Sequence, residues 1–255
     1  MKPQWSAALI VAGLVSAYSP SGPASQTVTF RGKEQTLRIY GNRSGDPVIV
    51  ASGDGGWVHL GPHVAGFLAT KGFYVVGLDA RAYLASFTSA NATLGAENVA
   101  SDFRTLAAFA AVGRSKKPIL VGVSVGAGLS VLAATDTQTT AAIGGVVGLG
   151  LPDLNELGWR WRDAVIYVTH RLPNEPTFST AAIADQVAPL PLGAVHSTHD
   201  EFVSVADVQN VLQHARDPKK LWVVNASDHR FSDNSAEFDR RLLEAIEWVK
   251  QNAPR

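Results

Sequence analysis

The chain has 255 residues, 46% of them hydrophobic, which is long enough for one large domain around a sizeable core. Its 22 Lys and Arg balance 22 Asp and Glu, and no basic run occurs, which argues against nucleic acid as a partner. Cysteine is absent, which excludes disulfides, thiolate metal ligands and a cysteine nucleophile.

The first residues have the pattern of an export signal. Lys2 supplies a positive charge, and the apolar stretch WSAALIVAGLVSAY (5–18) is short for a membrane span. We therefore predict a signal peptide over residues 1–25, a mature domain over 26–255, and a periplasmic or secreted protein. No second apolar stretch reaches transmembrane length, so the mature chain is predicted to be soluble, without a transmembrane segment.

The rest of the chain has the pattern of an α/β fold. TVTFRG and QTLRIYG alternate apolar and polar residues and predict an N-terminal β-hairpin with a Gly-Lys-Glu turn. Continuous apolar runs, typical of strands buried on both faces of a parallel sheet, occupy 47–52, 73–79, 118–124, 142–150, 191–197 and 221–227. Helical patterns occupy 63–71, 96–111, 127–134, 205–215 and 235–251. This order predicts a mostly parallel sheet covered by helices on both faces.

One segment interrupts the alternation of strands and helices. Leu151–Pro189 is rich in aromatic residues and prolines. Open α/β sheets bind their ligands at the carboxyl edge. We therefore interpret this segment as a lid-like insertion over that edge.

A nucleophile motif follows the third of the apolar runs. Gly122-Val123-Ser124-Val125-Gly126 matches G-x-S-x-G, with a predicted strand before it and a predicted helix after it. The turn forces the serine into a strained conformation, and a Cβ two residues away would collide with neighbouring backbone. Ser124 is therefore predicted to be a nucleophile at the sheet edge, and the alternative is an ordinary glycine-rich turn.

A serine nucleophile needs a base, and the base needs an acid. In this fold the chain order is serine, acid, histidine. His229 follows the last predicted strand and is the expected base, although a solvent-facing loop histidine would look the same. Asp200 follows the preceding strand and is the expected acid, with Glu201 as the neighbour most able to replace it.

Two further interpretations concern the loops at this edge. His196, His199 and Asp200 are also metal-ligand types, but the fold accounts for this stretch without a metal. The loop SGDGGW (52–57) follows the first core strand, where hydrolases place one donor of the oxyanion hole. We predict the backbone N–H groups of Val125 and Asp54 as the donors, with Gly55 as the next candidate. A phosphate-binding loop is the alternative, but neither phosphate-loop motif is present.

Motif order and loop sequences together resemble a known family. Elbow, acid, histidine and glycine loop occur in the order of an α/β hydrolase, and SGDGGW, FYVVGLDARAYL and the elbow are similar to the bacterial VirJ/AcvB group. The resemblance implies a periplasmic hydrolase of aminoacylated phosphatidylglycerol or a related lipid ester. The elbow departs from the group, because Val123, Val125 and Gly126-Ala127-Gly128 replace its aromatic residue and its Gly-Ala-Asp.

The predicted reaction is hydrolysis of a carboxylic ester through an acyl-enzyme, with a small-molecule or lipid ester as substrate and no cofactor. A peptidase, a thioesterase, an acyltransferase or a binding protein on a hydrolase scaffold are the alternatives. The oligomeric state is not encoded in any pattern we recognise. Aromatic residues predicted to form the pocket wall are Trp57, Tyr83, Trp159 and Trp161.

Overall fold

The computed structural model describes residues 23–161 and 175–254. The predicted signal peptide therefore lies almost wholly outside the described residues, as does the middle of the predicted insertion. Within the described residues no helix is both long enough and apolar enough to span a bilayer.

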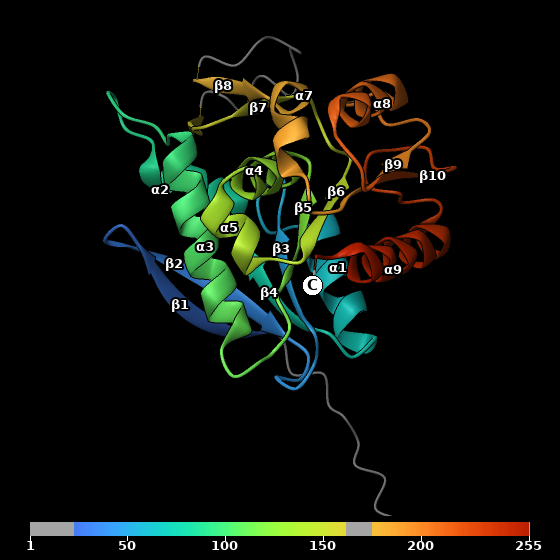
Figure 1. Ribbon diagram of the computed structural model, residues 1–255. Helices are drawn as coiled ribbons and strands as arrows, with labels where there is room; N and C mark the ends of the chain where they lie inside the picture. Colours follow the sequence, from blue (N-terminus) through green and yellow to red (C-terminus); the bar gives the residue numbers. More distant parts are fainter. Residues whose placement is uncertain (1–22, 162–174, 255) are drawn as a thin grey trace, which may run out of the picture.

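A central sheet of eight strands organises the fold (Figure 1). Its strand order is β1-β2-β4-β3-β5-β6-β9-β10, and β2 runs antiparallel to both of its neighbours, while every pair from β4 to β10 is parallel. The strands are β1 (Ala24–Phe30), β2 (Lys33–Tyr40), β3 (Pro47–Ala51), β4 (Tyr74–Leu78), β5 (Ile119–Val123), β6 (Gly145–Leu149), β9 (Leu192–Ser197) and β10 (Lys219–Val224). The predicted α/β architecture is therefore confirmed.

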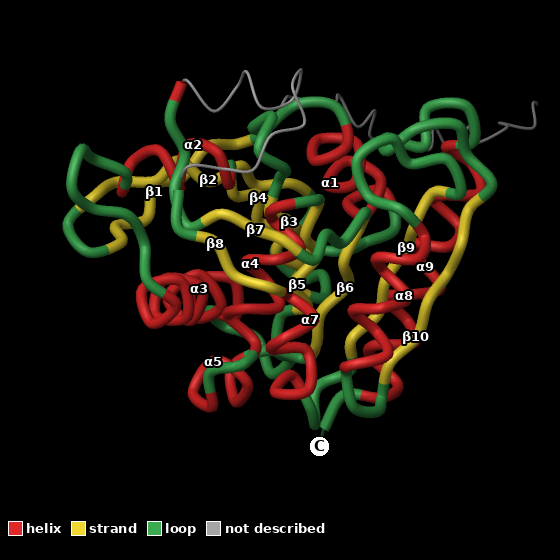
Figure 2. Tube along the Cα trace, turned by 90° about the horizontal axis from the view of Figure 1, so that it is seen from above, coloured by secondary structure: helices red, strands yellow, loops and turns green. Residues whose placement is uncertain are grey.

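Helices cover both faces of this sheet (Figure 2). One apolar cluster packs α1 (Leu60–Thr70) and α9 (Ser235–Asn252) against one face. The other cluster includes residues of α2 (Ala80–Phe87), α3 (Ala96–Ala111), α4 (Val125–Ala134) and α8 (Val205–His214). Because strands β3, β4, β5 and β6 are buried along their whole length, both faces must be apolar, as their continuous hydrophobic sequences predict.

The N-terminal hairpin is present, but its turn differs from the prediction. Phe30 pairs with Lys33, so Arg31 and Gly32 form the turn, and Lys33 and Glu34 belong to β2. Both turn residues have positive φ, 46° and 81°, as two-residue hairpins of this twist require. The guanidinium of Arg31 binds the buried carboxylate of Asp102 on α3, at 2.7 Å and 3.1 Å, and this ion pair joins the turn to the helix.

The described part of the insertion contains short regular elements that the sequence analysis did not predict. β7 (Leu154–Glu156) and β8 (Thr177–Ser179) form a separate antiparallel pair. They are followed by the single turn α7 (Thr180–Ile183) and a 3₁₀ turn over Ala184–Val187. The helices α2 and α5 (Thr137–Ala142) were also missed, and each begins at an aspartate whose carboxylate accepts a backbone N–H three residues on.

Candidate active site

Ser124 occupies a strained turn between β5 and α4. Its backbone has φ 50° and ψ −120°, a conformation that side-chain-bearing residues rarely adopt. The glycines on either side explain how the chain makes this turn. A Cβ on Gly122 would lie 2.3 Å from the Cα of Ala127, and a Cβ on Gly126 would lie 2.4 Å from the carbonyl oxygen of Ser52. The sequence Gly122-x-Ser124-x-Gly126 therefore has the geometry of a nucleophile elbow.

His229 and Asp200 lie together in the loops after β10 and β9. The imidazole Nδ1 donates to Asp200 Oδ2 at 2.6 Å. Side-chain exposure is 10% for the histidine and 0% for the aspartate, so water competes little for this bond. Gly150, at the end of β6, makes room for the ring, because a Cβ there would lie 2.3 Å from His229 Cε1. Three adjacent strand ends thus hold one imidazole.

The Asp200 carboxylate is held as an anion by hydrogen bonds. Burial alone would raise the pKa of Asp200. The hydrogen bond and the positive charge of His229 lower this pKa, and so do the hydrogen bonds from the backbone N–H groups of Val203 and Phe202. Both N–H groups donate to Oδ1 at 2.9 Å. The net result is a pKa below the usual aspartate value, so the acid is ionised at neutral pH.

Glu201, the alternative acid, has a different partner. Its Oε2 accepts the backbone N–H of His229 at 2.7 Å and makes no hydrogen bond to the imidazole among those of the described residues. The two adjacent carboxylates therefore bind the same residue at two places, one at the ring and one at the main chain. The sequence predicted Glu201 only as the neighbour most able to replace Asp200, because a contact to the main chain of His229 leaves no local pattern.

The three residues considered as possible metal ligands are each bound to a different partner. His196 is fully buried in β9, and its Nε2 lies 3.0 Å from the carbonyl oxygen of Val203. His199 Nδ1 lies 3.0 Å from Thr198 Oγ1. Asp200 is already bound to His229. Among the described residues no group of three or more ligand-type side chains is arranged to hold a metal ion.

Ser124 and His229 line the same pocket, which has a volume of about 450 Å³. Within the described residues no hydrogen bond joins Ser124 Oγ to His229, although both residues line this pocket. The other lining residues come from the glycine loop, the residues that lead from it into α1, the end of β5 and the loops after β9 and β10: Gly53, Asp54, Gly55, Gly56, Val58, His59, Leu60, Gly61, Val123, Phe202 and Arg230.

The predicted amide donors lie beside this pocket. Val125 is the first residue of α4, so its N–H belongs to the helix turn that lacks internal partners. Asp54 and Gly55 line the pocket, and no backbone hydrogen bond of theirs occurs in the described chain. A Cβ on Gly53 would lie 3.5 Å from Ser124 Cβ, so this loop passes directly beside the serine.

The aromatic residues predicted to wall the pocket lie elsewhere. Tyr83 is fully buried, and its hydroxyl donates to Asp102 at 2.8 Å, so its prediction as a pocket residue was wrong. Trp57 covers Gly77 of β4, and its Nε1 donates to Tyr40 at 3.2 Å, which turns the ring toward the sheet. Neither Trp159, which is buried, nor Trp161, which is 82% exposed, is among the residues that line the Ser124 pocket.

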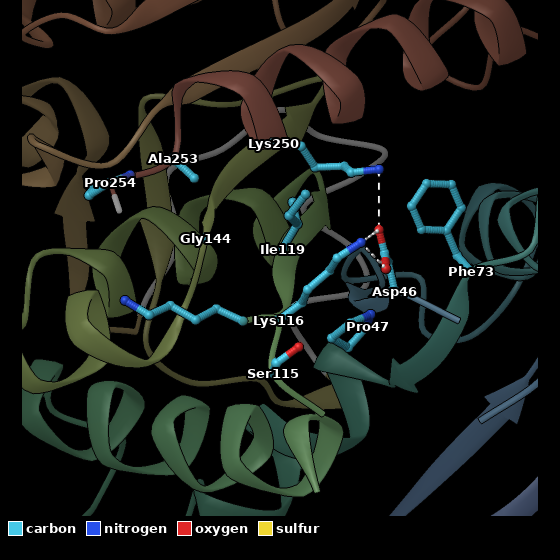
Figure 3. Close-up of a pocket in the computed structure, with 11 residues that line it drawn as sticks. Asp46, Pro47, Phe73, Ser115, Lys116, Ile119, Gly144, Lys250, Ala253 and Pro254 are labelled. Carbon is cyan, nitrogen blue, oxygen red and sulfur yellow. Dashed lines mark hydrogen bonds and ion pairs between the residues drawn. The ribbon is translucent and has the colours of Figure 1, made fainter. Parts of the chain in front are cut away.

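A second pocket of about 360 Å³ lies at the opposite, amino edge of the sheet (Figure 3). Asp46 lies between two of its lysines and binds Lys116 Nζ at 2.8 Å and Lys250 Nζ at 3.2 Å. The walls include Phe73 and Ile119, and the lining residues include no histidine. Of these two pockets, only the one that contains Ser124 is lined by histidines, and one of them, His229, is bound to a buried carboxylate.

The sheet with its one inverted strand, the serine elbow and the buried carboxylate–imidazole pair identify the fold as that of an α/β hydrolase. The family model described as bacterial virulence protein (VirJ) matches residues 46–249, and the chain belongs to this family. The fold and the family match both confirm the resemblance found in the sequence. Comparison with curated proteins gives no match.

Solved structures with a similar fold share little sequence with the chain. An esterase domain from Rhodothermus marinus is 18% identical, with a TM-score of 0.58, over 89% of this chain and 98% of that one. An α/β hydrolase from a Penicillium species is 12% identical, with a TM-score of 0.66, over 91% and 99% of the two chains. A membrane phospholipase A, described as a bacterial virulence factor, is 12% identical, with a TM-score of 0.63, over 90% and 87%.

Proposed function

We propose that the protein is a serine hydrolase that cleaves carboxylic esters through an acyl-enzyme. The observation that carries the proposal is that a strained serine and a carboxylate-bound imidazole line one pocket. Esterase and phospholipase names among proteins of the same fold are consistent with it.

The chemistry assigns one step to each group. His229 Nε2 takes the proton of Ser124 Oγ as the oxygen attacks the ester carbonyl carbon. Asp200 stabilises the imidazolium that forms, and the backbone N–H groups of Val125 and Asp54, with Gly55 as the alternative, stabilise the oxyanion. The leaving alcohol departs with the proton from His229, and water then releases the acid by the same route.

The pocket composition supports an aminoacyl phospholipid or a similar lipid ester as substrate. Asp54, which lines the pocket, supplies a carboxylate. Arg230 supplies a cation on the same pocket, and Val58 and Phe202 supply exposed apolar surface. An ammonium group, a phosphodiester and an acyl chain therefore each find a partner of matching chemistry.

The domain organisation belongs to the same proposal. Residues 1–25 act as a signal peptide that directs the domain of residues 26–255 to the periplasm or out of the cell. The lid-like insertion over Leu151–Pro189 is part of the same proposal, and its residues 162–174 lie outside the described residues. VirJ-family membership supports a bacterial virulence setting. N-terminal sequencing of the protein recovered from cell fractions tests the export step.

A fluorophosphonate probe tests the enzyme proposal directly. We expect labelling of the wild type and none of Ser124→Ala, with Ser130→Ala as a matched control, because Ser130 is buried in α4 and its hydroxyl donates to Gly126 O at 2.7 Å. A folded wild type that resists the probe would favour a binding protein. A panel of p-nitrophenyl esters, thioesters, amides and aminoacyl phospholipids separates ester hydrolysis from thioesterase, peptidase and acyltransferase activity.

A further inference from the structure

We propose that Glu201 is a positioning residue that fixes the main chain of His229, a role that rests on the proposed hydrolase function. Glu201 follows Asp200 directly, in the loop between β9 and α8. Its Oε2 accepts the His229 backbone N–H at 2.7 Å. This bond joins two loops whose residues are 28 positions apart in the chain.

The loop that carries His229 is also attached to the acid loop at its start, where the carbonyl oxygen of Ala226 accepts the His199 N–H at 3.2 Å and the Ser197 hydroxyl at 2.9 Å. Its other side-chain hydrogen bonds to backbone N–H groups are internal: Asp228 Oδ1 accepts from Arg230 at 3.0 Å and from Ser232 at 2.9 Å. These bonds shape the loop, and the bonds at Ala226 act three residues before the histidine, whereas the Glu201 bond acts on the main chain of His229 itself. The imidazole bond to Asp200 fixes the ring alone, and side-chain torsions still leave the backbone free to shift.

Two carboxylates on consecutive residues therefore hold His229 at two points. Asp200 Oδ2 binds the ring Nδ1 at 2.6 Å, and Glu201 Oε2 binds the main-chain N–H. A bond from a backbone N–H to a carboxylate is among the stronger hydrogen bonds in proteins. With backbone and ring both fixed, Nε2 has one position relative to Ser124, which is the condition for efficient proton transfer.

The role depends on an acceptor atom and on reach, and not on the negative charge. Glu201→Gln retains an oxygen at the same distance along the side chain. Glu201→Asp retains the charge but is shorter by one methylene. Glu201→Ala loses both the acceptor oxygen and the reach of the side chain. We expect Glu201→Gln to keep kcat within a few-fold, and Glu201→Ala and Glu201→Asp to lower kcat about 100-fold, the scale of a 1 Å misplacement, with KM nearly unchanged.

The experiment has a kinetic arm and a spectroscopic arm. Ester turnover gives kcat and KM, and proton NMR follows the His229 Hδ1 resonance, assigned by its loss in His229→Gln. We expect this resonance in the wild type and Glu201→Gln, and its loss through exchange with water in Glu201→Ala and Glu201→Asp. Glu247→Ala is the matched control, because Glu247 is a surface carboxylate of α9 paired with Lys250 at 2.9 Å.

Each outcome bears on one proposal. A normal resonance and normal kcat in Glu201→Ala overturn the positioning role, and so does a Glu201→Gln variant that behaves like Glu201→Ala. If Glu201→Ala does not fold, the contrast between Glu201→Gln and Glu201→Asp decides. If the wild type turns over no ester and resists fluorophosphonate, the hydrolase function fails, while the NMR arm still reports whether Glu201 holds His229.

Discussion

His229 Nδ1 and Asp200 Oδ2 are joined by a 2.6 Å hydrogen bond between two loops at the carboxyl edge of the sheet. Because the aspartate side chain is fully buried, this bond determines which imidazole nitrogen carries the proton. Nδ1 donates to the carboxylate, and Nε2 is left as the basic nitrogen.

Replacing Asp200 by Asn should therefore lower kcat strongly while the protein stays folded. The amide can present its N–H₂ group to Nδ1, which favours the wrong tautomer, and in serine proteases such a change costs about 10⁴-fold in kcat. Initial-rate assays with a p-nitrophenyl ester measure the loss of kcat, and circular dichroism checks that the variant is folded. A variant with normal turnover, together with an inactive Glu201→Gln, would mean that Glu201 is the acid.

Gly150→Ala should impair catalysis more than stability. Its φ is +57°, and the new Cβ would lie 2.3 Å from His229 Cε1, so the ring must move. We expect kcat to fall about 100-fold and the free energy of unfolding to fall by roughly 1 kcal/mol. Gly32→Ala is the matched control, because its φ is +81° with no atom within 4 Å of the new Cβ. Equal kcat losses in the two variants would rule out the ring contact as the cause.

The elbow glycines offer a test of the turn itself. In Gly126→Ala the new methyl would lie 2.4 Å from Ser52 O and 2.5 Å from Ala51 O, and backbone atoms cannot yield as a side chain can. We expect a loss of about 1–3 kcal/mol in the free energy of unfolding, typical of overpacking. Gly66→Ala, inside α1 with open space around it, should be neutral or stabilising by up to about 1 kcal/mol. Urea denaturation compares the two, and similar stabilities would contradict the steric argument.

Local sequence patterns were sufficient for the sheet and for the elbow. Strands such as Pro47–Ala51 and Ile119–Val123 are apolar throughout because both faces are covered, and this leaves a direct signal. The elbow and the positions of Asp200 and His229 follow from strand ends and chain order. The helix start at Asp79 has a weaker signal, since α2 has only eight residues, and it was missed.

Features that depend on distant contacts could not be predicted in this way. Tyr83 looked like a pocket residue, but its hydroxyl is taken by Asp102, 19 residues later. The same carboxylate binds Arg31, 71 residues earlier, in a turn that the sequence placed at residues 32–34. The bond from the His229 N–H to Glu201 is of the same kind. In each case the partner is brought close by the fold and not by the local sequence.

His196 should make the stability of the fold sensitive to mild acid. Burial is the largest cause that lowers its pKa, helped by His229, while Asp200, the Val203 carbonyl and Asp207 oppose it. Because the native pKa is depressed, the unfolded chain binds a proton more readily below its ordinary pKa near 6.5. The contribution of neutral His196 to the free energy of unfolding is therefore fully present above pH 6.5. It is lost as the pH falls from there toward the lower pKa that His196 has in the native protein.

His196→Gln isolates this contribution. Its side-chain N–H₂ group can donate to Val203 O as His196 Nε2 does, but it does not titrate. We expect urea denaturation at pH 8 and pH 5.5 to show a smaller acid-induced loss of unfolding free energy in the variant than in the wild type. Each pKa unit of native-state depression corresponds to about 1.4 kcal/mol of that difference. His214→Gln is the control, because His214 is exposed at the end of α8. Equal losses in wild type and His196→Gln would show that the buried imidazole does not govern the acid response.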